Sequence, residues 1–141
     1  MTAYRTALIS AVLLVAVSGC DSRGTTTTTP PKAAAASLAL DVCGTRKVRN
    51  PTQNDIRREV YALDTSRDEA FLILGTTDMT YIQTTGDRAH DFIVEYQESD
   101  AKHHYRAKRK LTADEIANVL IAYSSGSDFW KHTAEWERIT W

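Results

Sequence analysis

The sequence predicts one small domain of the α+β class, made of a helix, a four-stranded antiparallel meander and a second helix, followed by an aromatic C-terminal tail. Three observations support this prediction. Residues 49–141 carry the patterning of a folded domain, and about 90 residues are enough for one modest core. Two segments have apolar residues at helical spacing, and residues 71–107 between them contain short alternating or continuous apolar runs.

The first predicted helix begins near Pro51 and Thr52, which precede Asp55 in an arrangement typical of helix starts. Its apolar residues recur at positions i, i+4 and i+7, namely Ile56, Val60 and Leu63. Charged residues, Arg57 to Glu59, lie between the first two of them. This pattern indicates an amphipathic helix.

Four strands are predicted to follow. Residues 71–74 form a continuous apolar run that Gly75 ends, as in a strand covered on both faces. Residues 79–85 are rich in Thr, Tyr and Ile and lead into a Gly-Asp turn. In residues 92–96, the apolar residues Phe92, Val94 and Tyr96 alternate with Ile93 and Glu95, which predicts a third strand with a mostly buried face. Residues 103–107 are predicted to form a fourth strand whose charged face suits an exposed edge.

The second helix has the clearest local signature. Thr112 and Glu115 make a capping box, and Leu111 and Ile116 stand at the positions of a hydrophobic staple. The apolar stripe comprises Ile116, Val119, Leu120 and Tyr123, and the sequence Ser124-Ser125-Gly126 ends the helix.

The N-terminus has the order of a secretory signal. Arg5 supplies a positive charge, residues 6–17 are almost wholly apolar, and small residues precede Cys20. The apolar run is too short for a transmembrane helix, which needs about 20 residues. The stretch Val17-Ser18-Gly19-Cys20 resembles the lipobox of bacterial lipoprotein precursors, although Val17 stands where Leu is commonest. An ordinary secretory signal cut near Ser18 is the alternative.

The resemblance implies that residues 1–19 are removed and that Cys20 carries acyl chains, which hold the mature chain on the extracytoplasmic face of a membrane. Asp21 occupies the position that favours retention in the inner membrane if the host is Gram-negative. Residues 20–48 are assigned to the lipidated cysteine and a disordered Thr-, Pro- and Ala-rich tether. Residues 49–141 form the globular domain.

Charge and cysteine content narrow the function. Because Arg5 is the one charged residue before Cys20, the mature chain has 16 basic and 18 acidic residues and a formal charge of −2. This balance argues against nucleic-acid binding, which needs a basic excess. If Cys20 is acylated, Cys43 has no partner cysteine; if it is not, a Cys20–Cys43 disulfide becomes an option.

No catalytic motif, cofactor motif or metal motif is found in the sequence. His90 paired with His103 or His104 near Asp91 would suit zinc, but the spacing matches no established site, and solvated surface histidines are favoured. The fourth histidine is His132. Glu95 and Glu98 are considered as paired catalytic carboxylates. This interpretation is disfavoured because isolated carboxylates at strand ends are usually solvated.

Two surface features are candidate contact sites. A basic run is a candidate for contact with anionic lipid headgroups. The favoured interpretation is that its charges keep an exposed edge strand from aggregating. The run comprises Lys102, Arg106, Lys108, Arg109 and Lys110. An aromatic C-terminal segment is a candidate for partner binding; its residues are Trp130, Trp136, Trp141 and Arg138. For Trp130 and Trp136 a core role is favoured, and Trp141 is the better interface candidate.

The capped helix ending at Tyr123, with Gly126, Trp130 and the pair Trp136-Glu137 after it, is similar to the C-terminal part of small bacterial immunity-type proteins that neutralise toxins. This resemblance covers residues 111–141 and implies a non-enzymatic, toxin-binding protein. The sequence therefore favours a membrane-anchored lipoprotein that acts by protein binding. A structural or assembly lipoprotein of the cell envelope is the alternative, and a small-ligand binder or enzyme is the third.

Overall fold

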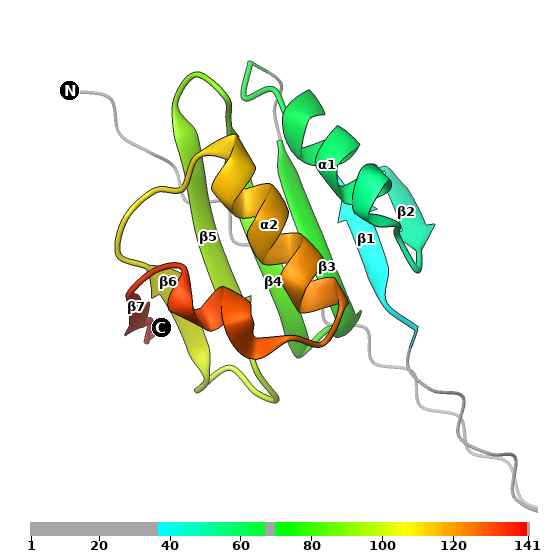
Figure 1. Ribbon diagram of the computed structural model, residues 1–141. Helices are drawn as coiled ribbons and strands as arrows, with labels where there is room; N and C mark the ends of the chain where they lie inside the picture. The colour runs from blue at the N-terminus through cyan, green and yellow to red at the C-terminus, as the bar shows by residue number, and fades with distance from the viewer. Residues whose placement is uncertain (1–36, 67–69, 141) are drawn as a thin grey trace, which may run out of the picture. The chain divides into compact units, whose positions relative to one another are not determined.

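The computed structural model describes residues 37–66 and 70–140. The signal peptide, the lipobox with Cys20, Asp21, most of the predicted tether and Trp141 lie outside the described residues. Within them the chain forms one antiparallel sheet in the order β2-β1-β3-β4-β5-β6-β7 (Figure 1). The strands are β1 (Ala39–Val42), β2 (Arg46–Arg49), β3 (Phe71–Thr77), β4 (Thr80–Asp87), β5 (Asp91–Gln97), β6 (His104–Ala107) and β7 (Trp136–Arg138).

Two α-helices, α1 (Gln53–Ala62) and α2 (Ala113–Ser124), lie on the same face of the sheet (Figure 1). Each begins with a capping box. In α1 the Thr52 hydroxyl accepts a hydrogen bond from the backbone N–H of Asp55, and the Asp55 carboxylate accepts one from the backbone N–H of Thr52. Thr112 and Glu115 make the same pair of hydrogen bonds at the start of α2. A short 3₁₀ helix, η1 (Asp128–His132), follows α2 and leads to β7.

The core lies between the sheet and the helices. Alternate residues of β3, such as Leu72 and Leu74, face the helices and are fully buried. The register places Leu74 opposite Ile82 and Ile82 opposite Tyr96, so one apolar row crosses three strands. The helices close the core with fully buried side chains, namely Ile56, Val60, Ile116 and Leu120.

The predicted α+β arrangement of a helix, a four-stranded meander and a helix is wrong. The domain is mainly an antiparallel sheet of seven strands with two α-helices among the described residues. The three unpredicted strands are β1, β2 and β7. Strands of three or four residues offer too few positions to show an alternation of period two, and the pairings of β1 with β3 and of β7 with β6 join segments that are distant in sequence.

β1 and all but the last residue of β2 lie within residues 20–48, the range that composition assigns to the tether. β1 pairs with β2 on one side and with β3 on the other, with Leu40 opposite both Val48 and Leu74. Leu40 is fully buried. The folded domain therefore begins at the first residues of β1 rather than at residue 49, and α1 carries the chain from edge strand β2 back to β3.

Neither α-helix in residues 37–66 and 70–140 is long and apolar enough to cross a membrane. Cys43 is a half-buried free thiol in the turn between β1 and β2, where its φ of 54° is in the left-handed region. The other cysteine, Cys20, lies outside the described part of the chain.

Candidate functional site

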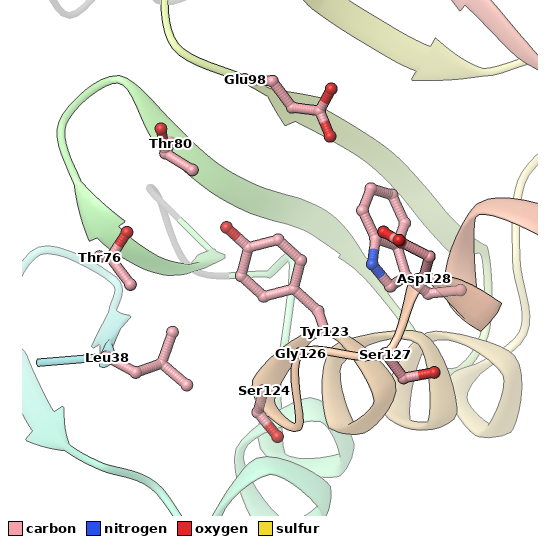
Figure 2. A pocket seen from close by; sticks show the side chains of 10 residues that line it. Leu38, Thr76, Thr80, Glu98, Tyr123, Ser124, Gly126, Ser127 and Asp128 are labelled. Carbon is pink, nitrogen blue, oxygen red and sulfur yellow. The ribbon is translucent and has the colours of Figure 1, made fainter. Parts of the chain in front are cut away.

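One hollow of the described surface lies where the C-terminal end of α2 meets the β3–β4 turn and η1, and we call it the end cleft. Its volume is about 340 Å³. Figure 2 shows the Tyr123 side chain extending from α2 into the middle of the cleft, with its hydroxyl directed toward Thr76 and Thr80. The lining residues are Leu38, Thr76, Thr80, Glu98, Tyr123, Ser124, Gly126, Ser127, Asp128 and Trp130.

The local sequence explains why the chain turns here. Gly126 has a φ of +73°, a conformation that residues with a Cβ adopt at a cost, so it allows the chain to reverse after α2. The N–H of Gly126 donates to the carbonyl of Tyr123 at 3.0 Å. The Ser127 hydroxyl then accepts from the N–H of Phe129 at 3.2 Å and caps η1. This turn brings Asp128 to the cleft.

An aromatic cluster forms one wall. Tyr123 lies edge-on to Trp130 with ring centroids 5.6 Å apart, and Trp130 lies edge-on to Tyr96 at 4.8 Å. Trp136 meets Tyr96 at 4.9 Å, and Tyr105 stacks on Tyr96 at 4.8 Å. Trp130 is only 4% exposed, so the wall belongs to the core as well as to the cleft.

Phe129, between the lining residues Asp128 and Trp130, has the opposite environment. It is 73% exposed, more than the other exposed large hydrophobic residues of the described chain, which are Met79 at 42% and Ile93 at 39%. An aromatic ring held in water beside a hollow is the arrangement of a binding anchor. Sequence analysis singled out the tryptophans here and missed this residue.

The charges of the cleft centre on Lys131. Its ammonium lies 2.6 Å from the Glu98 carboxylate, 3.5 Å from that of Asp128 and 5.4 Å from the centroid of the Trp130 ring. The hydrogen bond to Glu98 raises the pKa of Lys131. Burial, and then the charge of Glu98, raise the pKa of Tyr123, so its hydroxyl stays protonated as a hydrogen-bond donor.

The predicted partner-binding residues divide between core and surface. Trp130 is buried and Trp136 is half-buried, with its indole N–H donating to the carbonyl of Lys131 at 2.9 Å. Arg138 is exposed and its Nε–H donates to the carbonyl of Lys102 at 2.6 Å. The structure places these residues around the end of the sheet, but only Trp130 lines the cleft.

The predicted basic run is largely paired with carboxylates from other segments. Arg106 binds Glu95 and Lys108 lies 3.1 Å from Glu135. Arg109 makes two hydrogen bonds to Glu115, at 2.6 and 3.1 Å. Lys110 Nζ donates to the carbonyl of His90, while Lys102 is exposed at the β5–β6 turn. The carboxylates neutralise Arg106, Lys108 and Arg109 within the fold, whereas Lys102 and Lys110 are outside these three ion pairs.

His90 lies at the opposite end of β5 from His103 and His104. His90 is in the turn before β5 and binds Asp87 at 2.8 Å, whereas His103 is in the turn after β5 and binds Asp100 at 2.9 Å. His132 is at the end of η1. Among residues 37–66 and 70–140, no three His, Cys, Asp or Glu side chains are grouped closely enough to hold a metal ion.

Glu95 is the centre of a polar network on the sheet face opposite the helices. Its carboxylate accepts from Gln83 Nε2–H at 2.7 Å and from Arg106 Nε–H at 2.7 Å, and lies 3.2 Å from His104 Nε2. Burial pushes its pKa upward, but the hydrogen bonds from Arg106 and Gln83 outweigh burial and lower it. Glu95 is therefore a firmly ionised, fully engaged carboxylate, and Glu98 faces the cleft instead of joining it.

A second, more open hollow of about 550 Å³ lies between the end of α1 and the β4–β5 turn. The carboxylate of Asp87 lines this hollow. It accepts hydrogen bonds from the hydroxyl of Thr65 and from the N–H groups of Ala89 and His90. These bonds, that of Thr65 first, lower the pKa of Asp87. The acceptor capacity of Asp87 is spent on Thr65 and on the N–H groups of its own turn, so the end cleft is the better candidate.

Comparison with protein-family models, with curated proteins and with solved structures gives no match.

Proposed function

We propose that this chain is a bacterial lipoprotein, anchored through Cys20 on the extracytoplasmic face of a membrane, whose domain acts by binding a protein partner at the end cleft. The anchor part of the proposal rests on the sequence Val17-Ser18-Gly19-Cys20 and the apolar segment before it. The binding part is carried by one observation, the exposed ring of Phe129 beside the cleft.

Phe129 supports protein binding for an energetic reason. Covering a large side chain that is exposed in the free protein contributes about 2 kcal/mol. Aromatic anchors that insert beside a pocket are the residues that dominate binding energy at interfaces. A single exposed apolar residue is common on protein surfaces. Phe129 differs from that case because the residues on both sides of it, Asp128 and Trp130, line a cleft.

Toxin neutralisation, as in an immunity protein, is the sharpest form of the proposal. It draws on the resemblance of residues 111–141 and on the fact that the end of α2 and the start of η1, both in this segment, line the end cleft. The alternative is a structural or assembly lipoprotein of the cell envelope, which would also use a protein-binding surface. Identifying the partner separates the two: an immunity protein restores growth to cells that produce the toxin.

Site-specific photo-crosslinking tests the proposal in the producing cells. The full chain carries benzoylphenylalanine in place of Phe129, and a matched variant carries it in place of Ile93, which is 39% exposed on β5. We expect a discrete protein adduct from position 129 that is absent from position 93 and that excess parent chain suppresses. Identical adducts from both positions, or none from position 129, would contradict binding at the end cleft.

A further inference from the structure

We infer that the end cleft receives a cationic side chain of the partner, preferably the guanidinium of an arginine. This inference rests on the proposed function, because it names the chemistry of the partner at the same site. Four features of the end cleft favour a cation: two carboxylates, the negative end of a helix, aromatic walls, and an ammonium of the chain itself, that of Lys131, which already pairs with these carboxylates.

The end cleft has more carboxylates than cations to pair with them. Glu98 and Asp128 both line the cleft, and Lys131 is the one ammonium or guanidinium that the described structure pairs with them. The side chains of Glu98 and Asp128 are 45% and 85% exposed, so both can reach an incoming ligand. One negative charge at the cleft is left uncompensated.

The helix end adds to this charge. α2 ends at Ser124, and no basic residue stands in its last turn, although such residues commonly balance the partial negative charge there. Ser124 and Gly126, at this end, line the cleft. The macrodipole therefore favours a cation at the same place as the two carboxylates.

The walls favour an organic cation over a metal ion. Tyr123 and Trp130 present aromatic surface to the cleft, and Leu38 adds an aliphatic side. An aromatic face attracts ammonium and guanidinium groups within about 6 Å. The Lys131 ammonium meets this criterion at 5.4 Å from the Trp130 centroid, so the chain already makes such a contact. A guanidinium combines stacking on rings with bidentate bonding to carboxylates, which an ammonium does not.

Lys131 is then the internal competitor of the ligand. An arginine that pairs with Glu98 takes over the position that Lys131 occupies at 2.6 Å. Removing the Lys131 charge while keeping a long side chain against Trp130 should therefore strengthen binding. This sign distinguishes the inference from a general role of Lys131 in the fold, in which the same change would weaken binding.

The test uses the purified lipoprotein in detergent micelles and two pentapeptides, acetyl-Gly-Leu-Arg-Leu-Gly-amide and its twin with neutral citrulline for arginine. NMR follows the indole N–H of Trp130 and the backbone N–H of Ser127 and Asp128. We expect the arginine peptide to shift these signals and the citrulline peptide to bind at least about tenfold more weakly, since its neutral ureido group forms no ion pair with the carboxylates. Equal binding of both peptides, or no shift with the arginine peptide, would overturn the inference.

Variants of the chain locate the charges. Glu98→Gln and Asp128→Asn should each weaken the arginine peptide about threefold to tenfold, and Lys131→Gln should strengthen it about threefold. Glu135→Gln is the matched control, because Glu135 is also exposed and also pairs with a lysine, Lys108, but does not line the cleft. It should change nothing. Weaker binding by Lys131→Gln counts against the inference.

The two proposals fail separately. If the adduct at position 129 forms but is insensitive to Glu98→Gln, and the two peptides bind equally, the cleft binds a protein without a cationic anchor. If no adduct forms while the arginine peptide binds at the cleft, the cation site stands and the protein partner does not.

Discussion

The ring of Trp130 meets the ring of Tyr96 edge-on, with centroids 4.8 Å apart and planes at 81°. This contact joins η1 to β5, two elements that lie 30 or more residues apart in the chain. It fixes the position of the cleft wall, and through it the side on which Phe129 is exposed. The two neighbours Trp130 and Phe129 therefore have opposite roles, one in the core and one on the surface.

Alanine substitutions should separate these roles. Trp130→Ala removes a 4%-exposed indole and should lower the free energy of unfolding by about 3–5 kcal/mol, because the site leaves a cavity that neighbours fill only in part. Phe129→Ala, at 73% exposure, should change it by less than about 0.5 kcal/mol. Denaturant unfolding measures both. A large loss for Phe129→Ala would mean that this ring serves the fold and would remove the basis for the binding site.

The Glu115 capping box gives a prediction about pH. Glu115 accepts from Arg109 at 2.6 Å and from the backbone N–H of Thr112 at 2.9 Å, and these bonds, that of Arg109 first, lower its pKa to about 2. The folded-state pKa lies below the unfolded value of 4.5, so the stabilisation is complete above about pH 4.5 and is lost as the pH falls through about 2. Because the side chain is 34% exposed, we discount the shift to about 1 kcal/mol.

The measurement compares Glu115→Gln with the parent chain by denaturant unfolding at pH 7, 4 and 3. At pH 7 the free energy of unfolding of the variant should be about 1 kcal/mol below that of the parent. Most of this difference should remain at pH 4, and less of it at pH 3. Glu135→Gln, whose parent side chain is 82% exposed, should show little difference at any of these values. A gap between Glu115→Gln and parent that grows on acidification would reverse the predicted sign.

Local signals in the sequence predicted some elements and missed others for a clear reason. The helix at Ala113–Ser124 could be recognised because its cap and its apolar stripe lie within a dozen neighbouring residues. β1 could not, because its four residues become a strand only by pairing with β2 and β3. Composition therefore assigned it to the tether. β7 likewise depends on pairing with β6, from which α2 and η1 separate it.

The candidate site depends even more on distant contacts. The basic run around Arg109 looks unpaired in the sequence because its carboxylate partners, such as Glu135, come from other segments. The end cleft joins Thr76, Glu98 and Tyr123, which no spacing in the sequence connects. Gly126 after the second helix was the one local signal of the chain reversal that builds it.

Two glycines predict different costs of adding a methyl group. Gly86, at a φ of +141°, is paired with Phe92, and a Cβ there would lie 2.4 Å from the carbonyl oxygen of Asp91. Gly86→Ala must therefore move backbone and should cost about 3 kcal/mol or more. Gly126, at +73°, has open space around it, so Gly126→Ala should cost only the left-handed strain of about 1 kcal/mol. Thermal unfolding compares the loss of stability in the two variants. Equal losses would contradict the prediction and show that the backbone of the β4–β5 pair can move to accept the methyl group.

The two cysteines give a matched pair for the membrane anchor. If acyl chains on Cys20 hold the protein, Cys20→Ser should move it from the membrane fraction to the soluble extracytoplasmic fraction or block processing of residues 1–19, because a chain without acyl groups lacks the anchoring free energy of about 0.8 kcal/mol per buried methylene. Cys43→Ser should leave it in the membrane, since Cys43 is a free thiol in the β1–β2 turn. Intact-mass measurement adds a second readout, in which the parent and Cys43→Ser carry the mass of the lipid and Cys20→Ser does not. Membrane retention of processed Cys20→Ser after a high-salt wash would rule out lipid on Cys20 as the anchor.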